Sequence, residues 1–210
     1  MDIAVVDYGM GNLRSVSKAL EHVAPGMEVR VTSRPGDLRA AGRVVVPGQG
    51  AMPDCMRELR TRGLADAVVE ATRAKPFLGI CIGLQMLFDY SEEGGVAGLA
   101  VLPGAVRRFP LGLNDASGRR LKIPHMGWNE VVRTGAHPLW EGIAAASRFY
   151  FVHSYYADEA DERNAIGSCT YGMPFTAAVA RDNIFAVQFH PEKSQSAGLQ
   201  MLQNFVHWHP

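Results

Sequence analysis

Cysteine is scarce in this chain, where Cys55, Cys81 and Cys169 stand far apart among 210 residues. An odd number at such spacing indicates neither a disulfide framework nor a metal-binding cluster, so no metal is expected and Cys55 and Cys169 are interpreted as structural. An excess of one charge is also lacking, because 21 basic residues balance 21 acidic residues. This balance argues against a nucleic-acid or membrane surface as the main function.

Long apolar runs are missing as well. No stretch approaches the length that spans a membrane, and Asp2 stands where a signal peptide has a basic start, so a cytoplasmic protein is expected. Repeats, low-complexity runs and Ser-rich linkers are also missing. With 47% hydrophobic residues, the chain is expected to form a single domain over residues 1–210.

Short apolar segments alternate with helical patterns in the first half of the chain. The pattern predicts strands at 3–7, 28–32, 43–46 and 77–80, and helices at 12–24 and within 52–73. This order predicts an α/β fold with a largely parallel central sheet and helices on both faces, whose ligands gather at the carboxyl ends of the strands.

The second half has a different pattern and ends in an expected helix over 194–207. Its short β-rich runs are expected to be antiparallel additions to the same sheet. They occupy residues 100–107, 127–132, 149–152, 165–171, 175–180 and 184–189.

Cys81 stands between Gly79 and Gly83, where a short apolar run changes to helical spacing through residues 84–88. This arrangement predicts a strand, a tight turn and a helix, with Cys81 on a strained turn and its thiol accessible, as in a nucleophile elbow. Free N–H groups at the first helical turn would favour a thiolate and stabilise an oxyanion. The alternative is a small buried side chain, so the chemistry requires a base elsewhere.

A candidate base follows the apolar run at 184–189. His190 and Glu192 lie on either side of Pro191, and an extended backbone would place their side chains on the same side. The Glu192 carboxylate would then orient the His190 imidazole, which would act as the base for Cys81. Taken alone, the pair is more often a surface histidine beside a solvated glutamate, so the functional interpretation depends on the rest of the sequence.

Three segments together resemble the class I, or triad, glutamine amidotransferases: PGQG at 47–50, GICIGLQ at 79–85 and VQFHPE at 187–192. Further segments narrow the resemblance to the glutaminase subunits of imidazole glycerol phosphate synthases, which act in histidine biosynthesis. These are DYGMGNLRSV at 7–16, PHMGWN at 124–129, FVHSYY at 151–156 and EKSQ at 192–195.

The resemblance implies that Cys81 is the nucleophile, His190 the general base and then acid, and Glu192 the orienting carboxylate. Glutamine would be hydrolysed to glutamate and ammonia through a γ-glutamyl thioester, without a cofactor. Backbone N–H groups of Gln49 and Ile82 would stabilise the oxyanion. The residues implied to hold substrate glutamine are Gly48, Gly50, Gln85, Ser154 and Tyr155, although Gln85 could instead be a polar residue on an exposed helix face.

The resemblance also implies a heterodimer with a (β/α)₈-barrel cyclase. The cyclase would receive ammonia through a tunnel and make imidazole glycerol phosphate and an aminoimidazole carboxamide ribotide. Because ammonia released to water would be protonated and lost, the interface should be dry. The implied partner-facing residues are Asn12, Met126, Trp128, Tyr150 and Lys193; for Trp128, expected on a loop, the alternative is an ordinary core residue.

Other functions remain open at this stage. The chain could be the glutaminase subunit of another synthase, against which the segment 125–129 argues, or a stand-alone thiol hydrolase of γ-glutamyl peptides. A non-enzymatic binding module with the same fold is a further alternative. The intact set of Cys81, His190 and Glu192 argues against that module.

Overall fold

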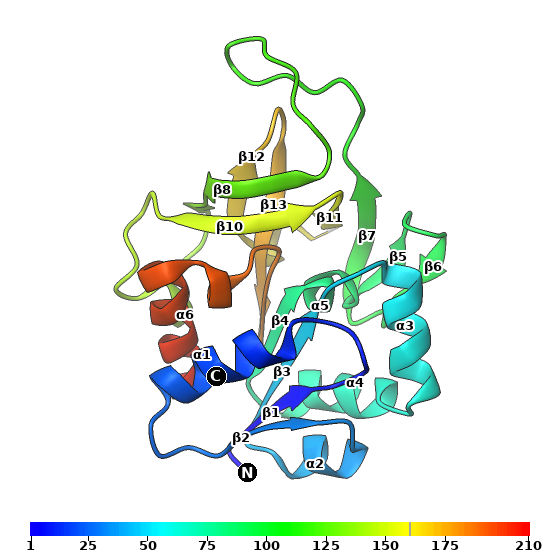
Figure 1. The fold of residues 1–210 in the computed structure, drawn as a ribbon, viewed down its shortest axis with the longest axis vertical. Helices are drawn as coiled ribbons and strands as arrows, with labels where there is room; N and C mark the ends of the chain where they lie inside the picture. Colours follow the sequence, from blue (N-terminus) through cyan, green and yellow to red (C-terminus); the bar gives the residue numbers. More distant parts are fainter. Residues whose placement is uncertain (160) are drawn as a thin grey trace.

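The computed structural model describes residues 1–159 and 161–210 (Figure 1). Its strands are β1 (Ile3–Val6), β2 (Val29–Thr32), β3 (Arg43–Gly48), β4 (Phe77–Cys81), β5 (Phe88–Ser91), β6 (Val96–Ala97), β7 (Leu102–Arg108), β8 (His125–Glu130), β9 (Val132–Arg133), β10 (Arg148–His153), β11 (Tyr155–Glu159), β12 (Ala165–Thr170), β13 (Pro174–Arg181) and β14 (Ile184–Val187). Its helices are α1 (Leu13–Val23), α2 (Pro35–Ala40), α3 (Met52–Thr61), α4 (Ala65–Ala74), α5 (Ile82–Gln85) and α6 (Gln195–His207), with 3₁₀ turns η1 (Pro138–Trp140), η2 (Glu162–Asn164) and η3 (Pro191–Lys193).

The centre of the molecule is a parallel sheet in the order β2-β1-β3-β4-β14. Strands β1, β3, β4 and β14 are buried along their whole length, as expected for parallel strands covered on both faces. Helices α1 and α6 pack together on one face, and α2 and α4 pack together on the other (Figure 1). The predicted α/β class and the parallel sheet are therefore confirmed.

Two expectations for the second half are wrong. Strand β14 is not antiparallel to its central neighbour but runs parallel to β4, because β13 turns the chain back just before it. Strands β8 and β10 do not join the central sheet but pair with each other as a separate two-stranded sheet.

The separate sheet lies across β12 and β13 (Figure 1). Its two strands alternate between buried and more exposed residues, so it has an inner face, with the rings of Phe149, Phe151, His125 and His153, that is covered by the rest of the protein. Phe151 of β10 packs edge-on against Phe175 of β13, with ring centroids 5.8 Å apart. Packing one sheet face on another buries these rings, which edge-to-edge pairing would leave uncovered.

The helix expected after Cys81 is shorter than its hydrophobic spacing suggests. Helix α5 ends at Gln85, and Phe88 begins strand β5, which pairs with β7. Residues 82–88 are all buried, so this segment has no solvent-facing side to favour an amphipathic helix. The Leu87 carbonyl instead accepts hydrogen bonds from the N–H groups of Val101 and Leu102, both at 2.8 Å.

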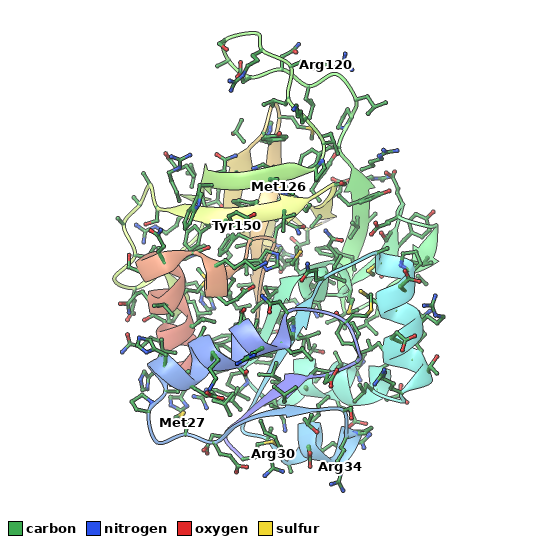
Figure 2. All side chains as sticks on the ribbon, in the orientation of Figure 1. Met27, Arg30, Arg34, Arg120, Met126 and Tyr150 are labelled. Atoms are coloured by element: carbon green, nitrogen blue, oxygen red, sulfur yellow. The ribbon has the colours of Figure 1, made fainter. Side chains whose placement is uncertain are left out.

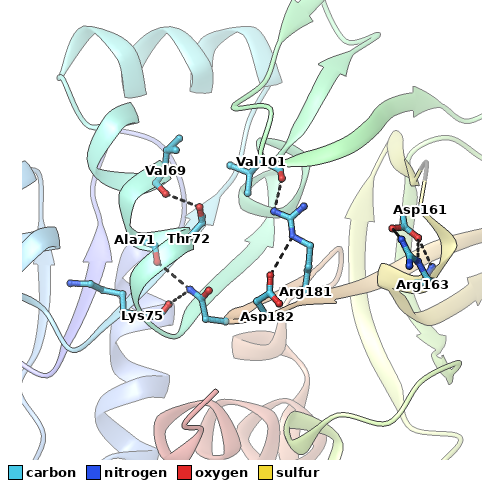
Figure 3. A network of polar contacts seen from close by, with 10 residues as sticks. Val69, Ala71, Thr72, Lys75, Val101, Asp161, Arg163, Arg181 and Asp182 are labelled. Carbon is cyan, nitrogen blue, oxygen red and sulfur yellow. Dashed lines mark hydrogen bonds and ion pairs between the residues drawn. The ribbon is translucent and has the colours of Figure 1, made fainter.

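Polar contacts hold the beginnings of β4 and β14 together (Figure 3). The Asn183 amide donates to the Lys75 carbonyl at 2.6 Å, just before β4. A separate hydrogen bond, from Arg181 at the end of β13 to the Val101 carbonyl at 2.7 Å, joins β13 to the segment just before β7. With these ends fixed in register, the carboxyl ends of β4 and β14 lie side by side, which places Cys81 next to the segment that begins at Gln188.

The close packing of α5 on β3 leads to a prediction about stability. A Cβ on Gly83 would lie 1.9 Å from the Val46 carbonyl oxygen, so Gly83→Ala should cost roughly 3 kcal/mol or more in the free energy of unfolding. Gly36 is a matched helical control, because a Cβ there meets no atom within 4 Å. Denaturant unfolding of both variants checks this, and equal stabilities would contradict it.

Candidate active site

A cavity of about 250 Å³ opens at the carboxyl ends of the central strands. The register pairs Gly48, the last residue of β3, with Cys81, the last residue of β4. Cys81, Gln85 and His190 line this cavity together with Ser154 and Tyr155. The structure therefore brings the predicted nucleophile and base together with four of the predicted substrate-binding residues, Gly50, Gln85, Ser154 and Tyr155, whereas Gly48 does not line the cavity.

Cys81 has the strained backbone that the sequence predicts. Its φ of 57° and ψ of −108° lie in a region that non-glycine residues rarely adopt, between β4 and α5. The prediction of an accessible thiol is wrong for bulk solvent, because Cys81 is only 4% exposed. Its sulfur borders the cavity and accepts a hydrogen bond from the Gln188 amide at 3.7 Å.

His190 and Glu192 form a buried pair. Nδ1 of His190 lies 2.8 Å from Oε1 of Glu192, and their side chains are 3% and 1% exposed. The surface alternative for this pair is therefore wrong. The expected extended backbone between them is also wrong, because Pro191 begins the 3₁₀ turn η3. This turn nevertheless brings the two side chains together.

The charge state of His190 follows from its surroundings. Burial alone would lower the pKa of His190, but the Cys81 thiolate and the Glu192 carboxylate outweigh burial and raise this pKa to about 10. Within the described residues, Nε2 of His190 has no hydrogen-bond partner. The imidazole thus donates Nδ1–H to Glu192 and leaves Nε2 for a reacting group beside Cys81.

The predicted oxyanion donors belong to neighbouring segments. Ile82 is the first residue of α5, where N–H groups have no carbonyl partner within the helix. Gln49 follows Gly48 directly, and both Gln49 and Gly50 line the cavity. A Cβ on Gly48 would lie 2.5 Å from Cβ of Ile82, so only glycine allows β3 to approach the turn this closely.

Gln85 is not on an exposed helix face. It is 2% exposed, and its amide nitrogen donates to the Tyr155 carbonyl at 3.1 Å and to Oε1 of Gln188 at 2.9 Å. Its own oxygen is buried without a hydrogen-bond partner among the described residues. Gln85 is thus fixed by its nitrogen and has an acceptor left for a ligand.

Sequence reasoning missed two side chains at this site. Gln188 lies within the VQFHPE segment, which was a signal, but its contacts with Gln85 and Cys81 depend on the strand register. Glu93 lines the cavity, and its carboxylate accepts the Met52 N–H at 2.8 Å. No pattern in the sequence separates Glu93 from the exposed Glu92 beside it.

Partner-facing residues were expected around Trp128. Met126 is 62% exposed and Trp128 is 38% exposed, so the core alternative for Trp128 is wrong. Both residues lie on strand β8 and not on a loop. Tyr150 of β10 packs edge-on against Trp128 at 6.1 Å, and the Lys193 amine lies 5.8 Å from the Tyr150 ring centroid. Figure 2 labels Met126 and Tyr150 on these neighbouring strands. We call these four residues the outer patch.

Asn12 has a local structural role. Its side chain accepts the Ser15 N–H at 3.4 Å and caps α1, which contacts η3. Asn12 therefore begins the helix that packs against the turn holding Lys193.

The remaining cysteines are free and buried. Burial raises the pKa of the Cys55 thiol to about 11 and that of the Cys169 thiol to about 12, so both stay protonated at neutral pH. Across residues 1–159 and 161–210, no group of three His, Cys, Asp or Glu side chains is placed to hold a metal ion. Nor does this part of the chain contain a helix long and apolar enough to cross a membrane.

Comparison with known proteins places this geometry in context. The sequence model described as glutamine amidotransferase class-I matches residues 4–208. A relative from Nitrosospira multiformis is 64% identical over 210 residues, covering 100% of this chain and 99% of the relative, and is named imidazole glycerol phosphate synthase subunit HisH. Relatives with the same name come from Aromatoleum aromaticum (63% identical, 100% and 99% covered) and Dechloromonas aromatica (65% identical, 99% and 97% covered).

Solved structures resemble the fold at much lower sequence identity. A glutamine amidotransferase has a TM-score of 0.70 at 18% identity, with 98% of this chain and 99% of that chain covered. The structure of PurLQS from Thermotoga maritima has a TM-score of 0.68 at 19% identity, with 98% of this chain and 97% of that chain covered. At these identities the likeness shows the fold alone.

The His190–Glu192 pair leads to a prediction about protonation. Glu192→Gln removes a carboxylate that favours imidazolium, so the pKa of His190 should fall below about 10. NMR titration of the His190 ring measures this change. Glu21→Gln, which alters an exposed carboxylate paired with Lys18, should leave the titration unchanged. An unaltered His190 titration in Glu192→Gln would be inconsistent with the assigned pairing.

Proposed function

The chain belongs to the class I glutamine amidotransferases, and from this we propose that it hydrolyses glutamine with Cys81, His190 and Glu192 as catalytic triad. The observation that carries the triad is the buried His190, joined to Glu192 at 2.8 Å and next to Cys81 in the cavity. The names of relatives that are 63–65% identical over nearly the whole chain support its assignment as the glutaminase subunit of imidazole glycerol phosphate synthase, in histidine biosynthesis.

The reaction begins from an ion pair, in which the proton of Cys81 already lies on Nε2 of His190. The thiolate attacks the side-chain amide carbon of glutamine, and a C–S bond forms as the carbonyl becomes an oxyanion. His190 then returns a proton to the amine nitrogen, the C–N bond breaks and ammonia leaves. Its raised pKa keeps His190 protonated at neutral pH until that step.

Hydrolysis of the thioester completes the cycle. His190 takes a proton from water, hydroxide attacks the γ-glutamyl carbon, and the proton returns to sulfur as glutamate leaves. Backbone N–H groups of Gln49 and Ile82 are the proposed donors to the oxyanion in both halves of the reaction. Register pairing of Gly48 with Cys81 supports this role, because it places the two donors next to the nucleophile.

Substrate glutamine needs groups for its charged end as well as for its amide. We assign the backbone of Gly48, Gly50, Ser154 and Tyr155, together with the free oxygen of Gln85, to substrate binding. The α-ammonium group requires an anion, and Glu93 supplies a carboxylate at the cavity wall. Glu93 therefore joins the proposed substrate-binding residues.

We place the partner at the outer patch. The relatives are named as one subunit of an enzyme, which implies a partner subunit. We propose that this partner is a (β/α)₈-barrel cyclase, that the two form a heterodimer, and that ammonia passes between them without entering water. Exposed Met126 and Trp128, with Tyr150 and Lys193, are the proposed contacts, and Asn12 at the start of α1 extends them.

Two further proposals concern the domain organisation of the chain and the compartment in which the protein acts. We propose that residues 1–210 form one domain, which agrees with a single family match over residues 4–208. We also propose that the protein acts in the cytoplasm, where histidine biosynthesis takes place.

Replacement of the nucleophile tests the proposed chemistry. Cys81→Ala should abolish glutamine hydrolysis by the complex while leaving ammonia-dependent cyclase activity, because the small side chain fits the turn. Coupled assays with glutamine and with ammonium salts measure the two activities. Cys169→Ala is the control, since its thiol is buried away from the cavity. Glutamate release by Cys81→Ala at the normal rate would disprove the assignment.

The proposed ammonium site predicts a binding defect. Glu93→Gln should raise the KM for glutamine roughly tenfold to a hundredfold with a smaller effect on kcat, because a charge-assisted hydrogen bond is lost. The side-chain oxygen of the substituted residue can still accept the Met52 N–H, so this contact is kept in the variant. Steady-state kinetics measures this effect, with Glu92→Gln as the neighbouring control that pairs with Arg107 outside the cavity. Equal KM values for the two variants would refute the role of Glu93.

The outer patch predicts separable effects on binding and stability. Trp128→Ala should weaken the complex by about 2 kcal/mol or more, with little change in the melting temperature of the isolated chain. Calorimetric titration with the cyclase measures the first effect, and thermal melting measures the second. Tyr90→Ala removes another exposed ring, from β5, and should leave affinity intact. A large loss of melting temperature with normal affinity would mean that Trp128 supports the fold instead.

A further inference from the structure

Two buried histidines lie outside the proposed triad: His153 lines the cavity, and His125 lies next to His153 but does not line it. His125 of β8 and His153 of β10 are directly opposite each other in the two-stranded sheet and are 3% and 6% exposed. Aromatic rings surround them: Phe151 and Tyr171 stack on His125, and Phe109 and Phe175 contact both. Packing alone would be satisfied by apolar side chains here, so the ring nitrogens need an explanation.

The hydrogen bonds of these rings run in one direction. The Tyr155 carbonyl can only accept, so Nδ1 of His153, at 2.8 Å, must carry a proton. Nε2 of a neutral His153 then accepts from Nδ1–H of His125, at 2.9 Å. Nε2 of His125 in turn accepts from the Asn129 amide at 3.3 Å.

Both rings suit this neutral arrangement. Burial lowers the pKa of His125 to about 4 and that of His153 to about 3, so each is uncharged at neutral pH. Each ring therefore donates once and accepts once, and the chain from Asn129 to Tyr155 satisfies all four ring nitrogens. Such a fully satisfied buried network fixes the geometry of its members.

The chain ends at an atom that matters for the pocket. The Tyr155 carbonyl accepts a second hydrogen bond from Gln85, whose nitrogen also reaches Gln188. Gln188 in turn donates to the Cys81 sulfur at 3.7 Å. A shift of the Tyr155 carbonyl would therefore move the side chain that is proposed to hold glutamine.

We propose that His125 and His153 are positioning residues for the glutamine pocket, which hold the Tyr155 carbonyl, and through it Gln85, by one directed hydrogen-bond relay. The proposal rests on the proposed glutaminase function. Strand β8 contributes to two sites, since His125 and Asn129 face inward while Met126 and Trp128 face outward in the outer patch. The relay therefore begins on the strand that also carries the proposed partner contacts.

Kinetics of the complex test the positioning role. His125 does not line the cavity, so its replacement acts on glutamine only through other residues. His125→Leu should raise the KM for glutamine roughly tenfold with kcat nearly unchanged, because a buried hydrogen bond is lost. His125→Asn keeps a donor near the position of Nδ1 and should restore most of the wild-type KM.

A matched control separates positioning from packing. Phe109→Leu disturbs the same aromatic cluster without removing a relay hydrogen bond, so it should lower the melting temperature and leave KM unchanged. A wild-type KM in folded His125→Leu, no recovery in His125→Asn, or an equal rise in KM in Phe109→Leu would each overturn the proposal.

Nitrogen NMR of the unsubstituted protein tests the relay without relying on catalysis or on a variant that must fold. At neutral pH, both His125 and His153 should be neutral with the proton on Nδ1. A proton on Nε2 of either ring would overturn the relay, whatever the activity. A different result would be that both protons are on Nδ1 but the wild-type complex does not hydrolyse glutamine. This result would reject the proposed function and the positioning role that rests on it, whereas the hydrogen-bond geometry would stand.

Discussion

The hydrogen bonding of β4 between β3 and β14 is the constraint on which the site depends. Parallel pairing aligns the carboxyl ends of these three strands, so Gly48, Cys81 and the segment leading to His190 reach the same edge of the sheet. Glycine at positions 48 and 83 allows the backbone of β3 and the turn after Cys81 to approach at distances that exclude a side chain. A shift in this register would separate the proposed nucleophile, Cys81, from its proposed base, His190.

Burial then determines the chemistry at that edge. An isolated buried histidine would lose its proton, as His125 and His153 do. His190 is buried to a similar degree, but the Glu192 carboxylate and the Cys81 thiolate stabilise its charged form. The same residue type is thus charged at the proposed acid–base position and neutral in the proposed relay, because a carboxylate and a thiolate lie beside His190 alone.

The two-stranded sheet joins the interior of the protein to its surface. Alternation along β8 and β10 places the outer patch on one face and the histidine relay on the other. Because the inner face packs on β13 and the relay ends at Tyr155, this small sheet forms part of the pocket wall as well as an exposed surface. The arrangement provides a short physical connection between the proposed partner surface and the proposed glutamine pocket.

The sequence by itself determined the parallel strands β1 to β4 and the residue types of the proposed triad. Apolar strands alternating with amphipathic helices are a local signal, and the segments around Cys81 and His190 are specific enough to recognise without a structure. Where a local signal conflicts with packing, only the tertiary structure decided which secondary structure forms. The helical spacing through Phe88 gave way to strand β5, because a segment buried on every side gains nothing from an amphipathic helix.

The same distinction holds within the site. Hydrogen bonding between His190 and Glu192 was predictable from their spacing, although the turn that achieves it was not. The roles of Glu93, Gln188 and the His125–His153 pair depend on contacts between residues far apart in the chain. Such contacts follow from strand register and sheet packing, which no local pattern in the sequence specifies.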